Sequence, residues 1–417
     1  MSSHLFKTVS AVSACIVSTG IMAAGPLVLD GPTGNTPVTY TDPNIVLDIE
    51  TGPLGSLTNA DAARLVTDAV ALWNNTTSAT ISINTTGTGV TEDIDSTNWV
   101  DYLPTPPTDY NDQDGINPVV FDDDGKIIDA IFGGTASNYI VGFASSIFLV
   151  GTGTFTEGFA VVNGKIGSTD DVDVDVLRLV IAHEIGHYFG LDHSQTNIDN
   201  TESSCPPIWT DTAAYPLMYP YACRNVPSLH PDDEMSVSML YPAADFNQTH
   251  GQIIGTFLLP DGTPVRGANI WAEEENGDAY SMVSDYLKEN TGLFNLRLPP
   301  GKYTLHANSI NNVFFDSSSV GPYADDQYGL SFQDPAASIG DVTLMDNTGT
   351  TAVVFNVTAD SSIDITFYSD GTGTYTSGKA ITDPTVVNSF TPSGGGGILN
   401  PFVALLIPAL VLSRRRL

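Results

Sequence analysis

Positively charged side chains are scarce in this chain of 417 residues. Lysine and arginine number 14 against 48 aspartates and glutamates, so the formal net charge is −34 at pH 7. Such a chain repels nucleic-acid phosphates and anionic membranes, and no basic patch offsets the repulsion. We therefore expect no nucleic-acid partner. The acidic surface suits a secreted protein in salty or calcium-containing surroundings, or it serves solubility alone.

Cysteine is also rare, with three residues in the chain, Cys15, Cys205 and Cys223. Cys15 lies in residues 1–24, where one lysine precedes a run of apolar and small residues, which is typical of a secretory signal peptide. A lipoprotein box at residues 12–15 is the alternative, with a very short apolar stretch before it. Removal of the signal would leave Cys205 and Cys223, which an oxidising compartment would allow to form a disulfide. We expect no thiol nucleophile.

A hydrophobic run of the ~20 residues needed for a permanent membrane span is missing, even at the C-terminus. Residues 398–412 are apolar but contain prolines; four glycines precede them and three arginines follow. This arrangement resembles the Gly-Gly C-terminal sorting tails of Gram-negative bacteria, which imply export and C-terminal processing machinery. A plain tail anchor with a glycine linker is the alternative. Both interpretations predict an extracytoplasmic protein, secreted or held at a bacterial cell surface.

The middle of the chain carries a dense histidine motif, His183-Glu184-Ile185-Gly186-His187-Tyr188-Phe189-Gly190-Leu191-Asp192-His193. His183 and His187 are four residues apart, so on a helix both imidazoles can bind one metal ion. Gly190 lies where the helix must end, because glycine tolerates a left-handed backbone, and the chain can then turn back to present His193. Three nitrogen ligands leave one position of a tetrahedral zinc ion open for water, as in catalytic sites. Glu184 could take a proton from that water. The alternative is a buried helix whose histidines only satisfy hydrogen bonds.

The pattern H-E-x-x-H-x-x-G-x-x-H resembles that of the metzincin zinc metalloproteases, in particular the matrixin-like branch. Three other segments match in the same order. Residues 59–74 resemble the first matrixin helix with its tryptophan, residues 215–221 resemble the Met-turn with Met218 beneath the metal ligands, and residues 229–242 resemble the closing helix. The resemblance spans about residues 40–245 and implies an α+β fold, with a mixed twisted sheet and long helices.

The resemblance also implies a function. Zinc on His183, His187 and His193, with Glu184 as general base, would make the protein a zinc-dependent endopeptidase for protein or peptide substrates. We expect it to be a monomer. The substrate would lie along an edge strand, for which residues 158–163 are the candidate. Two features depart from the relatives. No cysteine-switch segment precedes the domain, and Pro220 occupies the position of a tyrosine ligand in some metzincins, so Tyr221 is not assigned to the metal.

A second cation site is predicted from an acidic run. Asp122, Asp124 and Asp129 surround a glycine turn at Gly125, which resembles the start of a calcium loop. The run lacks the full twelve-residue spacing with a terminal glutamate. A solvated acidic turn is the alternative.

Beyond residue 245 the sequence changes to short alternating strands separated by turns. Residues 246–345 resemble a carboxypeptidase-regulatory-like β-sandwich, so an all-β region follows the predicted catalytic domain of residues 25–245. Residues 346–371 continue the β-structure, either closing the sandwich or forming a small third domain. Residues 372–397 are predicted to be a flexible stalk, and residues 398–417 are the C-terminal tail.

The sequence leaves one rival function open. A surface adhesion or glycan-binding protein could carry the same β-domains and a vestigial metal site. The intact ligand set and the glutamate argue against a vestigial site, because a degenerate site usually loses one of them. Within the enzyme hypothesis, nutrient digestion and the processing of one surface protein are not separated by the sequence.

Overall fold

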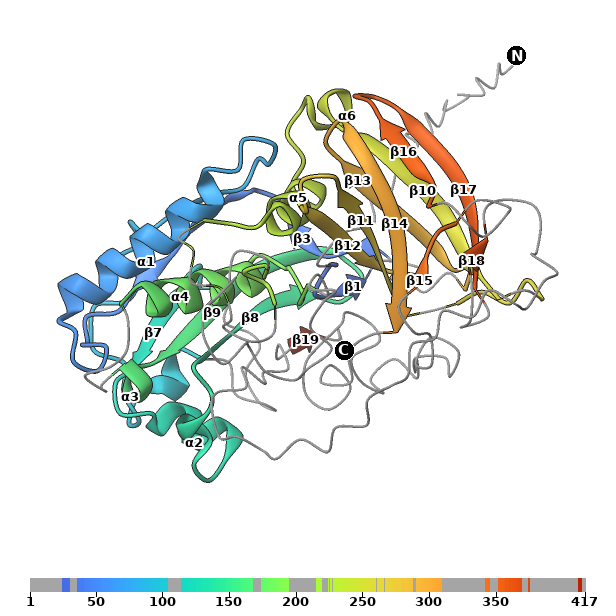
Figure 1. Cartoon of the computed structure of the whole chain (residues 1–417). Helices are drawn as coiled ribbons and strands as arrows, with labels where there is room; N and C mark the ends of the chain where they lie inside the picture. Colours follow the sequence, from blue (N-terminus) through green and yellow to red (C-terminus); the bar gives the residue numbers. More distant parts are fainter. Residues whose placement is uncertain are drawn as a thin grey trace, which may run out of the picture.

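The computed structural model describes residues 25–30, 36–103, 114–167, 174–194, 215–219, 224, 226, 228–259, 261–265, 267–287, 290–309, 342–345, 352–369, 374–375 and 412–414. The predicted signal peptide, both cysteines of the predicted disulfide, Tyr221, nearly all of the stalk and most of the C-terminal tail lie outside these residues. The described part divides into a mixed α/β region and a β-sandwich (Figure 1).

The α/β region is built on a mixed sheet whose interior strand is β9 (Thr154–Asn163). β8 (Gly142–Leu149) pairs antiparallel with one side of β9, and β7 (Pro118–Asp122) pairs parallel with the other side. β5 (Asp48–Ile49) follows β7 in parallel. Short strands complete the region: β1 (Leu29–Asp30), β2 (Thr36–Pro37), β3 (Thr39–Tyr40), β4 (Asn44–Val46), β6 (Ser82–Asn84) and β19 (Leu412–Arg414), which pairs with the end of β8.

Alternating side chains of the sheet enter two hydrophobic clusters, as the two-residue period of a strand requires. In β7, Val119 and Phe121 belong to the main cluster, which also holds the long helices, whereas Val120 belongs to a second cluster. The second cluster contains Ile127 and Ile128 of α2 (Lys126–Phe132). The sheet is therefore covered on both faces. Three short helices lie nearby: η1 (Trp99–Asp101), η2 (Ala136–Asn138) and α3 (Gly164–Gly167).

Two long helices carry the centre of the α/β region, and they pack against each other (Figure 1). α1 (Asn59–Asn74) begins at Thr58, whose side chain accepts a hydrogen bond from the Asp61 N–H. Its predicted limits, residues 59–74, are confirmed. α4 (Val174–Tyr188) contains the histidine motif and contacts β8 and β9. The Trp73 indole N–H donates to the Ala182 carbonyl of α4 across 2.8 Å, so the tryptophan joins α1 to the motif helix.

The β-sandwich consists of two sheets. One has the order β13 (Leu293–Leu298), β10 (Gly251–Leu258), β17 (Ser362–Ser369) and β18 (Thr374–Tyr375). The other contains β12 (Ala279–Val283), β11 (Ala268–Glu274), β14 (Gly301–Ser309) and β15 (Val342–Thr343), with β16 (Val354–Val357) also paired to β14. β16 and β17 pair with β14 and β10, so among the described residues they belong to the two sheets of this sandwich.

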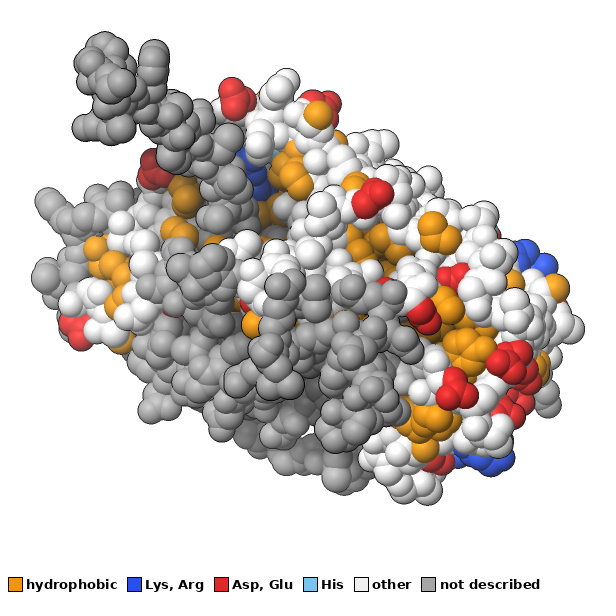
Figure 2. Space-filling view, turned by 180° about the vertical axis from the view of Figure 1, so that it is seen from behind, with side chains coloured by type: hydrophobic (Ala, Val, Ile, Leu, Met, Phe, Trp, Pro, Cys, Tyr) orange, Lys and Arg blue, Asp and Glu red, His pale blue; other side chains and the backbone are white. Residues whose placement is uncertain are grey.

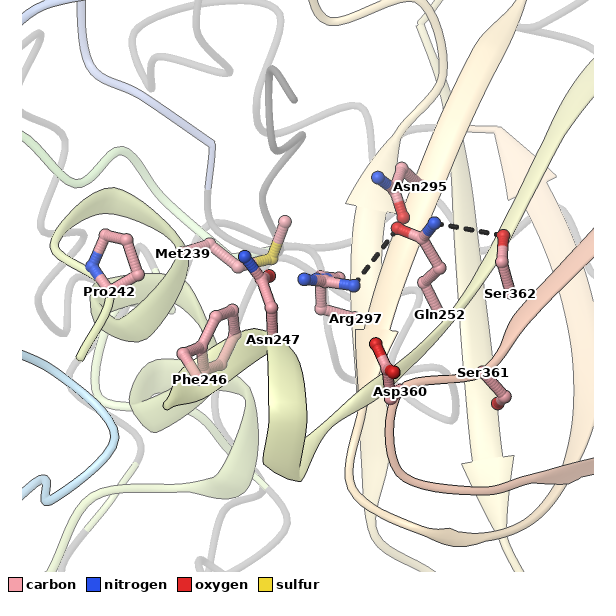
Figure 3. Close-up of a pocket in the computed structure, with 10 residues that line it drawn as sticks. All are labelled: Met239, Pro242, Phe246, Asn247, Gln252, Asn295, Arg297, Asp360, Ser361 and Ser362. Carbon is pink, nitrogen blue, oxygen red and sulfur yellow. Dashed lines mark hydrogen bonds between the residues drawn. The ribbon is translucent and has the colours of Figure 1, made fainter. Parts of the chain in front are cut away.

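One continuous hydrophobic cluster joins the sandwich to the α/β region. α5 (Pro231–Leu240) forms the junction, since it contacts β12 and β13, one strand from each sheet (Figure 1). α6 (Phe246–Thr249) follows it, and the Arg297 guanidinium of β13 lies 5.4 Å from the centre of the Phe246 ring. Beside this contact a cavity of about 320 Å³ is lined by residues from α5, α6 and the sandwich (Figure 3). None of the motif histidines lines it.

The described surface keeps the acidic character of the composition. Acidic side chains are spread over the face in Figure 2, and basic ones stand at few points. Among the described residues, lysine and arginine form ion pairs in three local contacts: Arg64–Asp61, Lys126–Asp124 and Arg178–Asp175.

At the coarse level the predicted fold class is confirmed, because a mixed α/β region precedes an all-β one. The strand β12 was not predicted, since residues 279–283 are all buried and do not alternate. No helix among the described residues is both long and apolar enough to cross a membrane.

The indole contact between α1 and α4 gives a prediction about stability. Trp73 is fully buried, so Trp73→Phe removes both packed volume and the hydrogen bond to Ala182. We expect the free energy of unfolding to fall by about 2 kcal/mol in urea titrations. Trp99→Phe is the matched control, because Trp99 is half-buried in η1, and we expect a loss below about 1 kcal/mol. Equal losses in the two variants would contradict the role given to Trp73.

Candidate metal centre

The end of α4 turns the chain back as the motif predicts. The last helical residue is Tyr188, and Gly190 has a φ of 102°, a left-handed conformation that favours glycine. The N–H of Gly190 donates to the His187 carbonyl, and the N–H of Leu191 donates to the Gly186 carbonyl. This reversal brings His193 beside the two histidines of the helix, so the predicted cap is confirmed.

The three histidines meet through one ring nitrogen each. The Nε2 atom of His187 lies 3.1 Å from Nε2 of His183 and 3.1 Å from Nε2 of His193. All three side chains are buried, with 2–3% of their surface exposed. The ligand atoms of these three histidines lie within 4.8 Å of one another, close enough to share one metal ion. Among the described residues, no other group of histidine, cysteine or acidic side chains does so.

Backbone carbonyls fix which nitrogens face the centre. Nδ1 of His183 lies 2.6 Å from the Leu217 carbonyl oxygen, and Nδ1 of His187 lies 2.8 Å from that of Leu191. A carbonyl only accepts, so each Nδ1 carries the proton and each Nε2 is left with a bare lone pair. Burial lowers the pKa of His183 to about 4 and that of His187 to about 3, so both rings are neutral near pH 7.

The donor set fits a zinc ion. Two lone pairs that face each other across 3.1 Å repel, unless a cation lies between them. Nitrogens bound to one tetrahedral zinc ion at about 2.0–2.1 Å lie roughly 3.3 Å apart, close to the separation in this protein. Outer hydrogen bonds from Nδ1 to carbonyls are the usual way in which proteins orient such ligands. The histidine group can therefore hold a metal ion.

Glu184 lies next to the first histidine and is isolated from other polar groups. It is buried, with 1% of its surface exposed, and neither carboxylate oxygen has a hydrogen-bond partner among the described residues. Burial raises the pKa of Glu184 well above 4.5. An unpaired buried carboxylate is costly, and a nearby divalent cation would favour its charged form. Such an isolated acid is typical of a functional position.

Met218 lies directly against the motif helix. A methyl group at Gly186 would lie 2.3 Å from the Sδ atom of Met218, so glycine is required for this close approach. The turn around Met218 is fixed by the buried Asp233 carboxylate of α5, which accepts from the N–H groups of Leu217 and Met218 at 2.7 and 3.0 Å. The methionine turn therefore lies against α4 at Gly186, the residue before His187.

The predicted Cys205–Cys223 disulfide lies outside the described residues, but its neighbour Arg224 anchors the same segment. The Arg224 side chain donates to the carbonyls of Tyr215, Ser228 and Leu229 at 2.8, 2.6 and 3.1 Å. These bonds join the methionine turn to the segment that leads into α5. The sequence analysis did not identify Arg224.

The predicted calcium ligands are not brought together. The buried Asp122 carboxylate accepts from the N–H groups of Ile127 and Ile128, where it caps the start of α2. Asp124 pairs with Lys126, and Asp129 accepts from the Ser137 N–H at 2.8 Å. These three carboxylates form no metal-binding group among the described residues. The geometry gives the calcium prediction no support, because each carboxylate serves a different backbone or lysine partner.

The prediction that residues 158–163 form an edge strand is wrong. They belong to β9, which is hydrogen-bonded to β8 on one side and to β7 on the other. At residues 142–146, next to the centre, the outer side of β8 has no strand partner among the described residues. A methyl group at Gly142, the first residue of β8, would lie 3.3 Å from Glu184 Oε1, so this end of the strand lies against the acid. The described pairing on the outer side of β8 is with β19, at residues 147–149.

Three buried aspartates around the centre were missed by the sequence analysis: Asp192, Asp232 and Asp233. The Pro-Asp-Asp sequence is a signal for a helix start, and α5 does begin there, with a capping box between His230 and Asp233. Their long-range partners could not be read from a helix-start signal.

No protein-family model matches this chain, and no curated protein matches its sequence.

The isolation of Glu184 predicts how stability depends on pH in the metal-free protein. The folded-state pKa lies above the unfolded value, so the unfolded chain loses its proton first and the wild type loses stability as pH rises above about 4.5. Glu184→Gln removes this term. We expect the variant to be more stable at pH 7, with an advantage that grows by at most about 1.4 kcal/mol per pH unit.

Urea titrations in the presence of a chelator, from pH 4 to pH 8, measure this difference. Glu275→Gln is the control, because Glu275 is exposed, and its stability is expected to follow the wild type at each pH. A Glu184→Gln variant that is less stable than the wild type at pH 7 would show that the carboxylate has a stabilising partner.

Proposed function

We propose that this protein is a zinc-dependent endopeptidase of the metzincin type, similar to the matrixins. The observation that carries the proposal is the pairing of three buried imidazole Nε2 atoms with a buried carboxylate that lacks a partner among the described residues. A structural zinc site fills all four positions with protein ligands, whereas three nitrogens leave one position for water.

Zinc held by His183, His187 and His193 would supply Lewis acidity to a water molecule and to the scissile carbonyl. Glu184 accepts a proton from the attacking water as the water oxygen bonds to the carbonyl carbon. The same carboxyl group then delivers that proton to the amine nitrogen as the carbon–nitrogen bond breaks. Burial raises the pKa of Glu184 above that of a free glutamate, which favours its holding the proton before the proton passes to the amine.

The substrate position in this proposal follows from β8. An extended peptide can add to the edge of a sheet through backbone hydrogen bonds. Gly142 starts β8 within reach of Glu184, so a peptide along this end of the strand would have a carbonyl near the acid. This edge replaces residues 158–163 in the proposal.

The features that support the metzincin assignment occur in the expected chain order. Trp73 of α1 donates a hydrogen bond to the motif helix α4, and the turn of Met218 lies against that helix. Asp233 of α5 accepts from the Met218 N–H and so fixes the turn. We also propose that the enzyme acts outside the cytoplasm on protein or peptide substrates. The signal-like N-terminus and the glycine-preceded C-terminal segment support this location.

Replacement of the general base tests the proposal. Glu184→Gln keeps the shape of the side chain but cannot accept a proton, so we expect kcat on a peptide library to fall by at least about 100-fold. The variant should bind zinc as the wild type does, which metal analysis after gel filtration measures. Glu275→Gln should keep full activity, and a chelator should abolish the wild-type activity until zinc is restored. Peptidase activity retained by Glu184→Gln would overturn the mechanism.

A further inference from the structure

The third histidine is held differently from the other two. His183 and His187 are fixed by the backbone hydrogen bonds of α4, but His193 lies five residues beyond the last helical residue. Its position therefore depends on the contacts of the loop that carries it. The residues directly before and after it, Asp192 and Ser194, are both fully buried.

Asp192 links this loop to the β-sandwich. One carboxylate oxygen accepts from the His193 N–H at 2.7 Å, and the other accepts from the Tyr286 hydroxyl at 3.1 Å. Tyr286 lies in the turn that follows β12, and 1% of its surface is exposed. The carboxylate also lies 3.9 Å from Nδ1 of His193, so a buried negative charge faces the ligand ring. Such a charge favours a cation bound to that ring.

Asp232 makes a second link from the other side of His193. One of its carboxylate oxygens accepts from the Ser194 hydroxyl at 2.5 Å, and the other accepts from the Ser281 N–H of β12 at 2.7 Å. Asp232 is fully buried, as are Ser194 and Ser281. The loop is thus joined to the same part of the sandwich through two separate carboxylates.

The N-terminal segment, residues 25–27, is also hydrogen-bonded to the loop that carries His193. The Leu27 N–H donates to the Gly190 carbonyl, and the Asp192 N–H donates to the Gly25 carbonyl. Gly25 lies against the Tyr286 ring, where a methyl group would come within 2.0 Å of the hydroxyl oxygen. Tyr286 therefore contacts both the histidine loop, at Asp192, and the N-terminal segment, at Gly25.

We propose that the β-sandwich helps to orient the third ligand of the metal centre. Tyr286 positions His193 through Asp192, and the backbone N–H of Ser281 positions the same loop through Asp232. The inference rests on the proposed function, because it takes the three histidines as metal ligands. It differs from the view of the sandwich as an appended binding module, since a module that only attaches to other molecules would need no contact with the ligand loop. Outer contacts of this type contribute about 10–100-fold to metal affinity.

The test removes one hydroxyl. In the full chain, Tyr286→Phe leaves the ring in place and deletes the hydrogen bond to Asp192. We expect its zinc dissociation constant, measured by competition with a chromophoric chelator, to rise about 10-fold. The absorption spectrum of the Co²⁺-loaded variant should also change, because the third ligand is less well oriented.

The matched control is Tyr303→Phe. Tyr303 is a buried tyrosine of β14 in the same sandwich, and its hydroxyl donates to the Pro299 carbonyl at 2.9 Å. This variant should lose similar stability but keep the zinc affinity and the Co²⁺ spectrum of the wild type. A purely structural role for Tyr286 would leave both variants alike in zinc affinity.

A second pair of variants tests the Asp232 link. Ser194→Ala deletes the hydroxyl that donates to Asp232, and we expect the same weakening of zinc binding. Ser238→Ala is its control, because that hydroxyl donates to the Glu234 carbonyl within α5 and should not affect the metal. If the wild type binds zinc and both Tyr286→Phe and Ser194→Ala keep its zinc affinity, the role of the sandwich is overturned and the metal centre still stands. A wild type that binds no zinc would overturn the metal centre and this inference together.

Discussion

The structure around the motif depends on one electrostatic constraint, the convergence of three buried imidazole Nε2 atoms, of which those of His183 and His187 carry bare lone pairs. Carbonyl acceptors at Leu217 and Leu191 hold the Nδ1 protons of His183 and His187, so their Nε2 lone pairs must face inward. Burial keeps the rings neutral and removes the water that would otherwise solvate those lone pairs. A divalent cation converts this repulsive arrangement into a favourable one.

Much of the surrounding fold serves to hold that arrangement in place. α1 fixes the motif helix through Trp73, and Asp233 fixes the methionine turn whose Leu217 carbonyl orients His183. Gly190 and Gly186 allow the chain reversal and the close approach of Met218. The sandwich adds contacts to the loop of His193. The centre thus draws on segments far apart in the sequence, and one hydrophobic cluster runs through both regions.

The sequence predicts the local parts of this site well. Its spacing places His183 and His187 on one helix face, and Gly190 has the left-handed conformation that a helix end needs. The helices expected at residues 59–74 and within residues 229–242 from the matrixin resemblance correspond to α1 and α5. These features depend on neighbours within a few residues, and short-range physical chemistry is enough to predict them.

The parts that failed depend on long-range partners. Residues 158–163 have the composition of a strand, but only the sheet order shows that β9 is an interior strand, between β8 and β7. Asp192 and Asp232 accept hydrogen bonds from Tyr286 and Ser281, which are 94 and 49 residues away in the chain. No local pattern contains that information.

X-ray absorption spectroscopy of the zinc-loaded full chain measures the ligands of the metal ion. We expect one zinc ion per chain with three imidazole nitrogens at about 2.0–2.1 Å and one further oxygen ligand. His193→Ala should reduce the imidazole number to two. A site with sulfur ligands, or a wild-type spectrum with fewer than three imidazoles, would contradict a three-histidine metal centre.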